Sequence, residues 1–349
     1  MKHSPKKILI AALDWGLGHT TRSIALARYY HQNGHKIYFA GNEIQRKLFL
    51  ASCPYAEALH LEGYNIHYAQ NKALFMPKLM SQLGKINSAI RRERFWLAKQ
   101  MEEHVFDVIL SDNRYGLYHA DATCILLTHQ LHIQTGTLLG NAFIKKVNQF
   151  LINRFDACWV VDNDAHPIAG KLSQSISLQV PIKYIGWLSQ FENVCKNTST
   201  LDNSYILAII SGPEPMRTQL ETKLIAQMQQ LSHQQFVVVG GTDKHTHYHF
   251  SNIQYLPLAD GENLFELISN AQYIISRSGY TTVMDCIQLR KKAIFIPTPG
   301  QTEQEYLAKH LEQLGYFATV AQHEIDLRKF DTLLKKTTLP PFSQDIPHI

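Results

Sequence analysis

The 349-residue chain has no apolar run of the roughly 20 residues that it takes to cross a bilayer. Its basic first residues lead only into the short run Ile8 to Leu13 before Asp14 interrupts it. We interpret that run as a first β-strand and not as a signal peptide. The five cysteines are widely spaced and form no Cys-x-x-Cys pair. This spacing predicts free thiols in a reducing, cytoplasmic compartment.

The sequence also lacks a complete dinucleotide-binding fingerprint. Gly16 and Gly18 begin a Gly-x-Gly-x-x-Gly pattern, but Thr21 stands in place of the last glycine, which argues against NAD binding. The net charge of +5 is modest and no nucleic-acid-binding motif accompanies it, so we expect no nucleic acid partner. With 45% apolar and 18% charged residues, the composition is that of a globular protein, and the length predicts about two domains.

Short apolar strands alternate with helices along the chain. In the first half we expect strands at 7–12, 36–40, 108–110, 124–127 and 158–161, with a helix over 20–31. The pattern restarts with strands at 205–210, 235–239, 253–256, 273–275 and 293–296. Apolar strands without alternation, separated by helices, indicate parallel sheets covered on both faces. We predict an α/β fold of two doubly wound, Rossmann-like domains, residues 1–186 and 187–349, which face one another across an interdomain cleft.

Residues 72–99 are rich in positive charge. They contain seven Lys or Arg residues and a single acidic residue, Glu93. Leu79, Leu83, Ile86 and Ile90 recur at the spacing of one helix face. A basic amphipathic helix with aromatic residues suits an anionic membrane surface. The alternative is a helical insertion that packs on its own domain and leaves its basic face in water.

Two segments of the second half place a short apolar strand before a polar turn that opens a helix. They are residues 276–285 and 297–304. The start of a helix offers unpaired amides and partial positive charge, which suit a diphosphate. Asp285 lies about one turn into the first helix, and the pair Glu303 and Gln304 lies at the start of the second. These features predict a pocket for a nucleotide sugar.

These residues resemble the donor-binding half of nucleotide-sugar glycosyltransferases of the two-domain GT-B type, and in particular the N-acetylglucosaminyltransferases of peptidoglycan lipid synthesis. The resemblance assigns the diphosphate to Arg277, Ser278 and Gly279, the ribose to Asp285, and the sugar to Glu303 and Gln304. That family usually has Glu in place of Asp285 and Gln in place of Glu305. The resemblance implies a UDP-sugar donor, with N-acetylglucosamine as the candidate sugar. The basic amphipathic stretch 72–99, and not the resemblance, suggests a lipid-linked acceptor. We expect a glycan or lipid-linked acceptor and a cytoplasmic protein on the inner face of the membrane.

Further donor contacts are expected in loops that follow strands. The glycines among them allow the backbone to approach a ligand closely. In similar transferases the loop that corresponds to Ser211 and Gly212 contacts the donor, and the backbone near Leu258 reads the base. The further donor-binding candidates are Gly16, Gly18, Ser211, Gly212, Gly241, Leu258 and Thr281.

His19 follows the first glycine turn and is the candidate general base. A neutral imidazole accepts a proton near neutral pH, and the resemblance places such a histidine between donor and acceptor. A carboxylate would orient it. Asp112 and Asp14 are the two candidates, although either suits a helix cap or a turn, and Arg114 could meet an anionic acceptor group.

We therefore predict a glycosyltransferase that inverts the anomeric carbon and needs neither a metal ion nor another cofactor. Two alternatives keep the same fold. One is a hydrolase or epimerase of nucleotide sugars. The other is a non-catalytic subunit that binds the donor.

Overall fold

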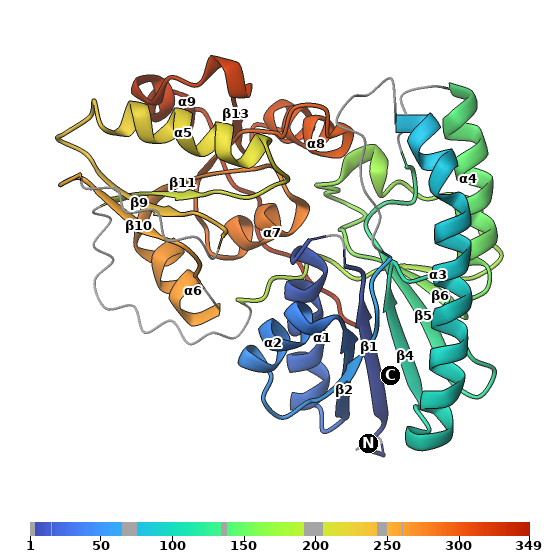
Figure 1. Cartoon of the computed structure of the whole chain (residues 1–349). Coiled ribbons are helices and arrows are strands. Elements are labelled where there is room, and N and C mark those ends of the chain that lie inside the picture. The colour runs from blue at the N-terminus through green and yellow to red at the C-terminus, as the bar shows by residue number, and fades with distance from the viewer. Residues whose placement is uncertain are drawn as a thin grey trace. The chain divides into compact units, whose positions relative to one another are not determined.

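The computed structural model describes residues 4–14, 16–64, 75–133, 138–191, 205–242, 250–259 and 261–349, without the side chains of residues 75–83 and 138–139. The chain forms two compact units (Figure 1). Unit 1 comprises Met1–Gln190 together with Ser343–Ile349, and unit 2 comprises Phe191–Phe342. The boundary lies close to the predicted one at residue 186. Residues 343–349, however, which we had assigned to the second domain, pack in unit 1.

The described part of unit 1 is built on a parallel sheet of seven strands in the order β3-β2-β1-β4-β5-β6-β7. The strands are β1 (Lys7–Ala12), β2 (Lys36–Gly41), β3 (Glu57–His60), β4 (Val108–Asp112), β5 (Thr123–Thr128), β6 (Ala157–Val160) and β7 (Ile182–Tyr184). The helices are α1 (Gly18–Gln32), α2 (Glu43–Ser52), α3 (Phe75–His104), α4 (Leu138–Ile152) and the 3₁₀ turn η2 (Gly170–Leu172). Every residue of β1 after the first is buried, as a central parallel strand requires.

Helices cover both faces of this sheet. Leu9 of β1 belongs to one apolar cluster with Leu97 of α3 and Ile152 of α4, and Figure 1 shows α1 and α2 on the opposite face. The chain order reverses between β1 and β4, which pair directly, with Ala12 opposite Asp112. Such a switch point opens a crevice at the carboxyl ends of the strands, where ligands of this architecture bind.

Unit 2 repeats the plan with a parallel sheet in the order β10-β9-β8-β11-β12-β13. The strands are β8 (Tyr205–Ile209), β9 (Gln235–Val239), β10 (Ile253–Leu256), β11 (Ala271–Ser276), β12 (Ala293–Phe295) and β13 (Ala318–Thr319). The helices are α5 (Met216–Met228), α6 (Gly261–Asn270), α7 (Tyr280–Gln288), α8 (Thr302–Gln313) and α9 (Phe330–Leu334), with 3₁₀ turns η3 (Gln322–Glu324) and η4 (Leu327–Lys329). Ile206 of β8 shares a core with Leu220 of α5 and Phe330 of α9. The switch point of this sheet lies between β8 and β11.

The predicted α/β class with two doubly wound sheets is confirmed. The strands at 7–12, 235–239 and 253–256 have the predicted bounds. Three short strands, β3, β7 and β13, were not predicted.

Candidate active site

The loop after β1 brings His19 to the switch point of unit 1. Gly16 turns the chain with a φ of +80°, which favours glycine, and its amide donates to the carbonyl of Asp14 at 3.0 Å. Helix α1 starts at Gly18, so His19 lies in its first turn. The N-cap residue is Leu17, whose side chain cannot accept a hydrogen bond. The first amides of α1 are therefore left for other partners.

Asp112 ends β4, and its side chain reaches His19. The distance from His19 Nδ1 to Asp112 Oδ1 is 2.9 Å. The carboxylate side chain is 2% exposed and the imidazole 13% exposed. When Nδ1 donates its proton to Asp112, Nε2 keeps a free lone pair, which is the form that a general base needs.

Asp14, the other candidate carboxylate, anchors the segment that follows β3. Its Oδ1 accepts a hydrogen bond from the backbone amide of Tyr64 at 2.9 Å. A Cβ atom at Gly63 would lie 2.0 Å from Oδ2 of Asp14, so the carboxylate occupies the space of a side chain there. Of the two carboxylates, the structure thus brings Asp112 against His19 and Asp14 against the backbone of 63–64.

Arg22 completes the cluster and was not among our predictions. Its side chain is 2% exposed. The Nε atom donates to Asp112 Oδ2 at 2.5 Å, and Nη2 contacts Asp112 Oδ1. Nη2 also lies 2.8 Å from His19 Nδ1, and Nη1 lies 3.0 Å from His129 Nδ1. The available signal was spacing, because residues three apart share a helix face.

The charges around His19 oppose one another. Burial lowers the pKa of His19; Asp112 raises it, Arg22 and His129 lower it, and the net result is a lowered pKa. Burial on its own would raise the pKa of Asp112, but Arg22 and His19 outweigh that effect and hold the pKa below its ordinary value. At neutral pH the cluster therefore contains an ionised carboxylate beside a neutral imidazole.

Arg114 has a different role from the acceptor contact that we considered. It forms a buried ion pair with Glu93 of α3, with 3.0 Å between Nη1 and Oε1. Its Nε donates to the carbonyl of Ala12 at 2.7 Å, and Nη1 donates to that of Glu62 at 3.0 Å. Arg114 therefore clamps the end of β1 to the segment after β3 and to α3.

The triplet Asp162-Asn163-Asp164 has the Asp-x-Asp form in which some glycosyltransferases hold a metal ion, and our prediction of metal independence overlooked it. Asp162 is fully buried. Its carboxylate accepts hydrogen bonds from Trp187 Nε1 (2.9 Å) and Ser173 Oγ (2.6 Å), as well as from the backbone amides of Asn163, Ile168 and Ala169. Among the described residues, no group of three or more His, Cys, Asp or Glu side chains is placed to bind a metal ion. The observed role of Asp162 is to fix its own loop.

In unit 2 the turn after β11 is built around Arg277, which is 1% exposed. Its Nη1 donates to the carbonyls of Ile296 (3.1 Å) and Pro297 (3.2 Å). Nη2 donates to Met216 (2.8 Å) and Nε to Ser211 (3.4 Å). Burial lowers the pKa of this guanidinium to about 10, so it is still charged at neutral pH. We predicted that Arg277 would meet a diphosphate; in the structure it ties the ends of β8 and β12 to the start of α5.

The two helix starts that we predicted to share a ligand are joined directly. The Ser278 hydroxyl, beside the start of α7, donates to the carbonyl of Gln304 in α8 at 2.8 Å. Gln304 Oε1 accepts from the amide of Thr298, and Glu305 Oε1 accepts from the amide of Gly300, both at 2.9 Å. These side chains shape the loop before α8, and the contact with Ser278 places the two helix starts side by side.

The other predicted donor residues of unit 2 follow strands or begin helices. Gly212 has a φ of +110° and Gly241 a φ of +66°, and Leu258 is 54% exposed. Gly279 is the N-cap of α7 and makes no side-chain cap. The remaining predicted residues are exposed Ser211, half-buried Thr281 and Glu303, and Asp285, which is 8% exposed.

The basic segment 72–99 is helical from residue 75, as part of α3. Residues 72–74 and the side chains of Leu79 and Leu83 lie outside the described part of the chain. Ile90 packs with Leu13 and Tyr64, and Ile86 packs against the same cluster, so this stretch of α3 is attached to its own unit. The opposite face holds Phe95, 79% exposed, among basic side chains.

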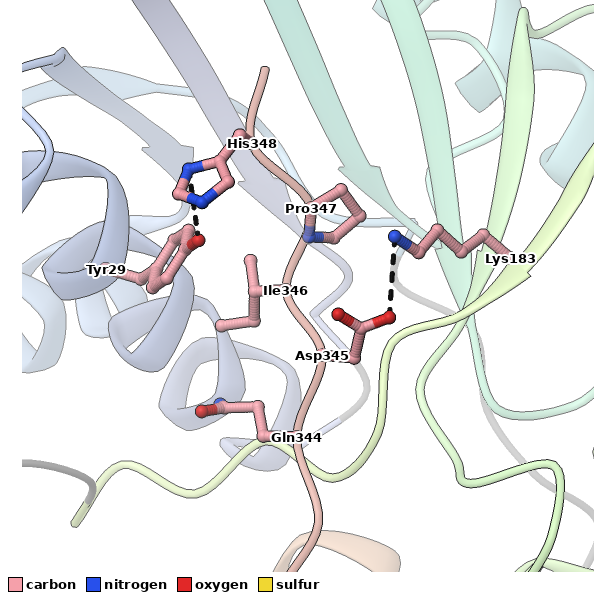
Figure 2. A pocket seen from close by; sticks show the side chains of 7 residues that line it. All are labelled: Tyr29, Lys183, Gln344, Asp345, Ile346, Pro347 and His348. Atoms are coloured by element: carbon pink, nitrogen blue, oxygen red, sulfur yellow. Dashed lines mark hydrogen bonds and ion pairs between the residues drawn. The ribbon is translucent and has the colours of Figure 1, made fainter. Parts of the chain in front are cut away.

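A hollow of about 440 Å³ lies in unit 1 where the C-terminal segment meets it (Figure 2). Residues 344–348 line it together with Tyr29 and Lys183. Lys183 pairs with Asp345 at 3.5 Å, and the Tyr29 hydroxyl lies 3.4 Å from His348 Nδ1. None of the described residues that line this hollow is one that we predicted for the site. Among the described helices, none has the length and apolar character to cross a membrane.

The solved structures to which this chain is similar include several glycosyltransferases. The kitacinnamycin glycosyltransferase aligns with a TM-score of 0.66 at 11% identity, over 96% of this chain and 91% of that chain. UGT89C1 of Arabidopsis thaliana, complexed with UDP-L-rhamnose, aligns with a TM-score of 0.63 at 10% identity, over 95% and 90%. The chain therefore has the GT-B fold of glycosyltransferases.

Comparisons of the amino-acid sequence add detail to this assignment as a glycosyltransferase. Residues 201–345 match the model of the glycosyltransferase family 28 C-terminal domain, which agrees with the chain being a glycosyltransferase. It is also 25% identical to the UDP-N-acetylglucosamine--N-acetylmuramyl-(pentapeptide) pyrophosphoryl-undecaprenol N-acetylglucosamine transferase of Histophilus somni. That alignment covers 95% of this chain and 89% of the relative.

Proposed function

We propose that the protein transfers a sugar from a UDP-sugar to an acceptor hydroxyl, with inversion of the anomeric carbon and without a metal ion. The observation that supports this most is the His19–Asp112 pair at the switch point of unit 1. The 2.9 Å contact from Nδ1 to the carboxylate orients the ring and leaves Nε2 as the proton acceptor.

In this mechanism His19 Nε2 takes the proton of the acceptor hydroxyl while the hydroxyl oxygen attacks the anomeric carbon. The bond from that carbon to the diphosphate breaks, and its electron pair stays on the departing oxygen. Asp112 stabilises the imidazolium that forms. The start of α7, where Gly279 provides no side-chain cap, offers amides and partial positive charge to the diphosphate.

We assign the donor to unit 2 with contacts based on those that the resemblance implies, except for Arg277 and Ser278, which the resemblance assigns to the diphosphate and which here donate to backbone carbonyls. Gly279 and Thr281 would meet the diphosphate, and Asp285 the ribose; the sugar falls to Glu303 and Gln304. Gly16, Gly18, Ser211, Gly212, Gly241 and Leu258 would line the donor through their backbones, and Arg277 and Ser278 would hold the loops in place. UDP is favoured because the Histophilus somni relative is named for UDP-N-acetylglucosamine and UGT89C1 is complexed with UDP-L-rhamnose.

The acceptor we propose is a lipid-linked glycan. The relative's acceptor is carried on pyrophosphoryl-undecaprenol, and the exposed face of α3 in this chain combines Phe95 with basic side chains. We therefore propose that the protein works as a peripheral protein on the cytoplasmic face of a membrane.

The test is to measure UDP release from UDP-N-acetylglucosamine and other UDP-sugars, with and without the relative's lipid-linked acceptor. His19→Ala is expected to lower kcat by about 10²–10⁴-fold, because the proton acceptor is lost. His31→Ala is the matched control, since His31 is an exposed residue of the same helix, stacked on Tyr55 at 3.6 Å. Wild-type turnover in His19→Ala would remove His19 from the mechanism.

The same measurement separates the alternatives. UDP release that needs no acceptor would indicate a hydrolase. Conversion of the donor sugar without net transfer would indicate an epimerase. Donor binding by the purified chain without any turnover would indicate a non-catalytic binding subunit.

A further inference from the structure

We infer that Arg22 is a positioning residue that keeps His19 in its neutral, proton-accepting form, by neutralising the carboxylate that His19 uses as its partner. The inference rests on the proposed role of His19 as the general base. It goes beyond that role by explaining how a histidine buried against an aspartate stays unprotonated.

Two side chains, Arg22 and His19, contact the same carboxylate, that of Asp112. Arg22 engages both oxygens of Asp112, through Nε at 2.5 Å and through Nη2. His19 Nδ1 approaches Oδ1, one of the same two oxygens, at 2.9 Å. Arg22 and Asp112 are each 2% exposed, so water does little to screen their charges. The negative charge of Asp112 is therefore already balanced before His19 takes up a proton.

Without Arg22, an isolated His19–Asp112 pair would become an ion pair. A buried carboxylate beside an imidazole favours the imidazolium, and an imidazolium has no lone pair left to accept the proton of an acceptor hydroxyl. With Arg22 in place, protonation of His19 puts a second cation 2.8 Å from Nη2. The imidazolium is then less stable than the neutral ring at neutral pH. When the reaction forms it, it readily gives up its proton again.

His129 and Tyr115 are other side chains that face the cluster. Arg22 Nη1 lies 3.0 Å from His129 Nδ1, after β5. His129 lowers the pKa of His19 in the same sense as Arg22 does. Tyr115, beyond β4, interacts with Asp112; burial first, then the interactions with Cys158 and Asp112, raise the pKa of its phenol. Among the described side chains that contact His19, Arg22 supplies the positive charge and Asp112 the negative charge.

The lowered pKa of His19 agrees with this balance, because burial and Arg22 together outweigh the opposing effect of Asp112. The direction of this pKa shift has a direct consequence for the pH dependence of activity. If His19 is the base, the acid limb of kcat/KM for the wild type should lie below pH 6.5, the ordinary value for histidine.

The experiment measures the pKa of His19 without any substrate, in four forms of the full chain: wild type, Arg22→Met, Asp112→Asn and the double variant. Long-range ¹H–¹⁵N spectra of chain labelled at its histidine nitrogens report the tautomer and the titration, and His19→Asn assigns the signal. Arg22→Met should raise the pKa of His19, and Asp112→Asn should lower it. The double variant should fall between these two.

Two further variants separate charge from structure. Arg22→Lys keeps the positive charge and should titrate close to wild type. Arg28→Met is the matched control, since Arg28 lies on the same helix and donates to the carbonyl of Gln190 at 2.6 Å; it should leave His19 unchanged. Should Arg22→Met fail to fold, Asp112→Asn and the double variant still decide the question. Identical His19 pKa values in Asp112→Asn and in the double variant would overturn the inference, because those two forms differ only at Arg22.

Activity gives the second readout. In Arg22→Met the ratio of kcat/KM at pH 8.5 to that at pH 6.5 should rise by about tenfold or more over wild type, since each pKa unit is a factor of ten. An equal loss at every pH would mean that Arg22 only maintains the structure. If His19→Ala retains full turnover while the four pKa values shift as expected, the proposed base is wrong and the role of Arg22 on His19 still stands.

Discussion

Gly241 is a residue that the fold holds in a conformation closed to other side chains. Its φ is +66°, and a Cβ atom would lie 2.4 Å from the carbonyl oxygen of Ile210. Gly16 is a natural comparison, because its φ is +80° while no atom of the described residues, its chain neighbours aside, lies within 4 Å of its Cβ position. The first glycine combines backbone strain with a collision, and the second has the strain alone.

We predict that Gly241→Ala lowers the free energy of unfolding by about 2–4 kcal/mol, whereas Gly16→Ala lowers it by about 1–2 kcal/mol, the cost of a left-handed backbone. Urea unfolding of the two variants beside the wild type measures the difference. Equal losses would show that the loop around Gly241 relaxes to make room, and that close packing against Ile210 is not required.

Some contacts between single residues could be anticipated from the sequence alone, and others could not. His19 and Asp112 were predictable because each follows an apolar strand, and parallel strands bring their carboxyl ends to one edge. Arg22 was not, because its meaning lies in a contact with Asp112 across 90 positions of sequence. The contacts of Arg277 were not predictable for a related reason, and its contact with a diphosphate stays a prediction. A motif indicates which residues are present, but burial among four backbone carbonyls appears only in three dimensions.

At the scale of elements, a buried arginine follows the strand across the switch point in each unit. Arg114 follows β4 and donates through Nε to the carbonyl of Ala12 at the end of β1. Arg277 follows β11 and donates through Nε to the carbonyl of Ser211 just after β8. The two units share no evident sequence repeat around these residues, yet each uses a guanidinium to fix the edge where its ligands are expected.

We predict that Arg277→Met destabilises unit 2 by on the order of 3 kcal/mol, because carbonyls at the strand ends lose their donors. UDP binding should weaken along with stability. Arg328→Met is the control: its side chain is 77% exposed in an ion pair with Asp326, and such pairs contribute about 1 kcal/mol or less. Calorimetry and UDP titration of both variants check this. Unchanged stability with lost UDP affinity would instead support the direct diphosphate contact that we first predicted.

The strands that the sequence did not reveal are those with little apolar character or length. β3 is an edge strand that runs Glu57–His60, with both end residues exposed, so it offers no apolar run. β7 has three residues and β13 has two. Central strands were predictable because burial on both faces demands continuous apolar residues. Short strands are stabilised mainly by backbone hydrogen bonds to a neighbouring strand. Such pairing does not require a recognisable pattern of side chains.

At the scale of the molecule, α3 and α4 each expose a large aromatic side chain to solvent. Phe95 of α3 is 79% exposed, and Phe150 of α4 is 63% exposed. Leu151 of α4 packs against the cluster that contains Ile90 of α3, so the two helices are neighbours. Exposed arginines and lysines accompany these aromatic rings, which is the composition of a surface that adsorbs to anionic lipid.

We predict that the chain co-sediments with vesicles of phosphatidylcholine and phosphatidylglycerol, and that high salt releases it. Arg91→Glu with Arg92→Glu should reduce binding by about tenfold or more, since each basic residue near such a surface contributes about 1 kcal/mol. Lys335→Glu with Lys336→Glu, an exposed adjacent pair of unit 2, is the control. Equal binding of both double variants would remove the α3 surface from the proposal.

The C-terminal segment shows what a linear sequence hides about a molecule of two units. Ser343 accepts a hydrogen bond from the amide of Trp187 at 2.8 Å, Asp345 donates through its amide to Ile185 at 2.9 Å, and Pro347 accepts from the Tyr30 hydroxyl at 2.8 Å. These contacts are mostly of the backbone. We assigned residues 343–349 to the second domain because chain order was the available guide.

Unit 2 is therefore an insertion in unit 1. The chain passes from one unit to the other twice, after Gln190 and before Ser343. A chimera in which unit 2 is replaced by the corresponding domain of another transferase needs two junctions. A single junction would remove the C-terminal residues that pack in unit 1. Designed with both junctions, such a graft would exchange unit 2, to which we assign the donor, while leaving His19, Arg22 and Asp112 in their native surroundings.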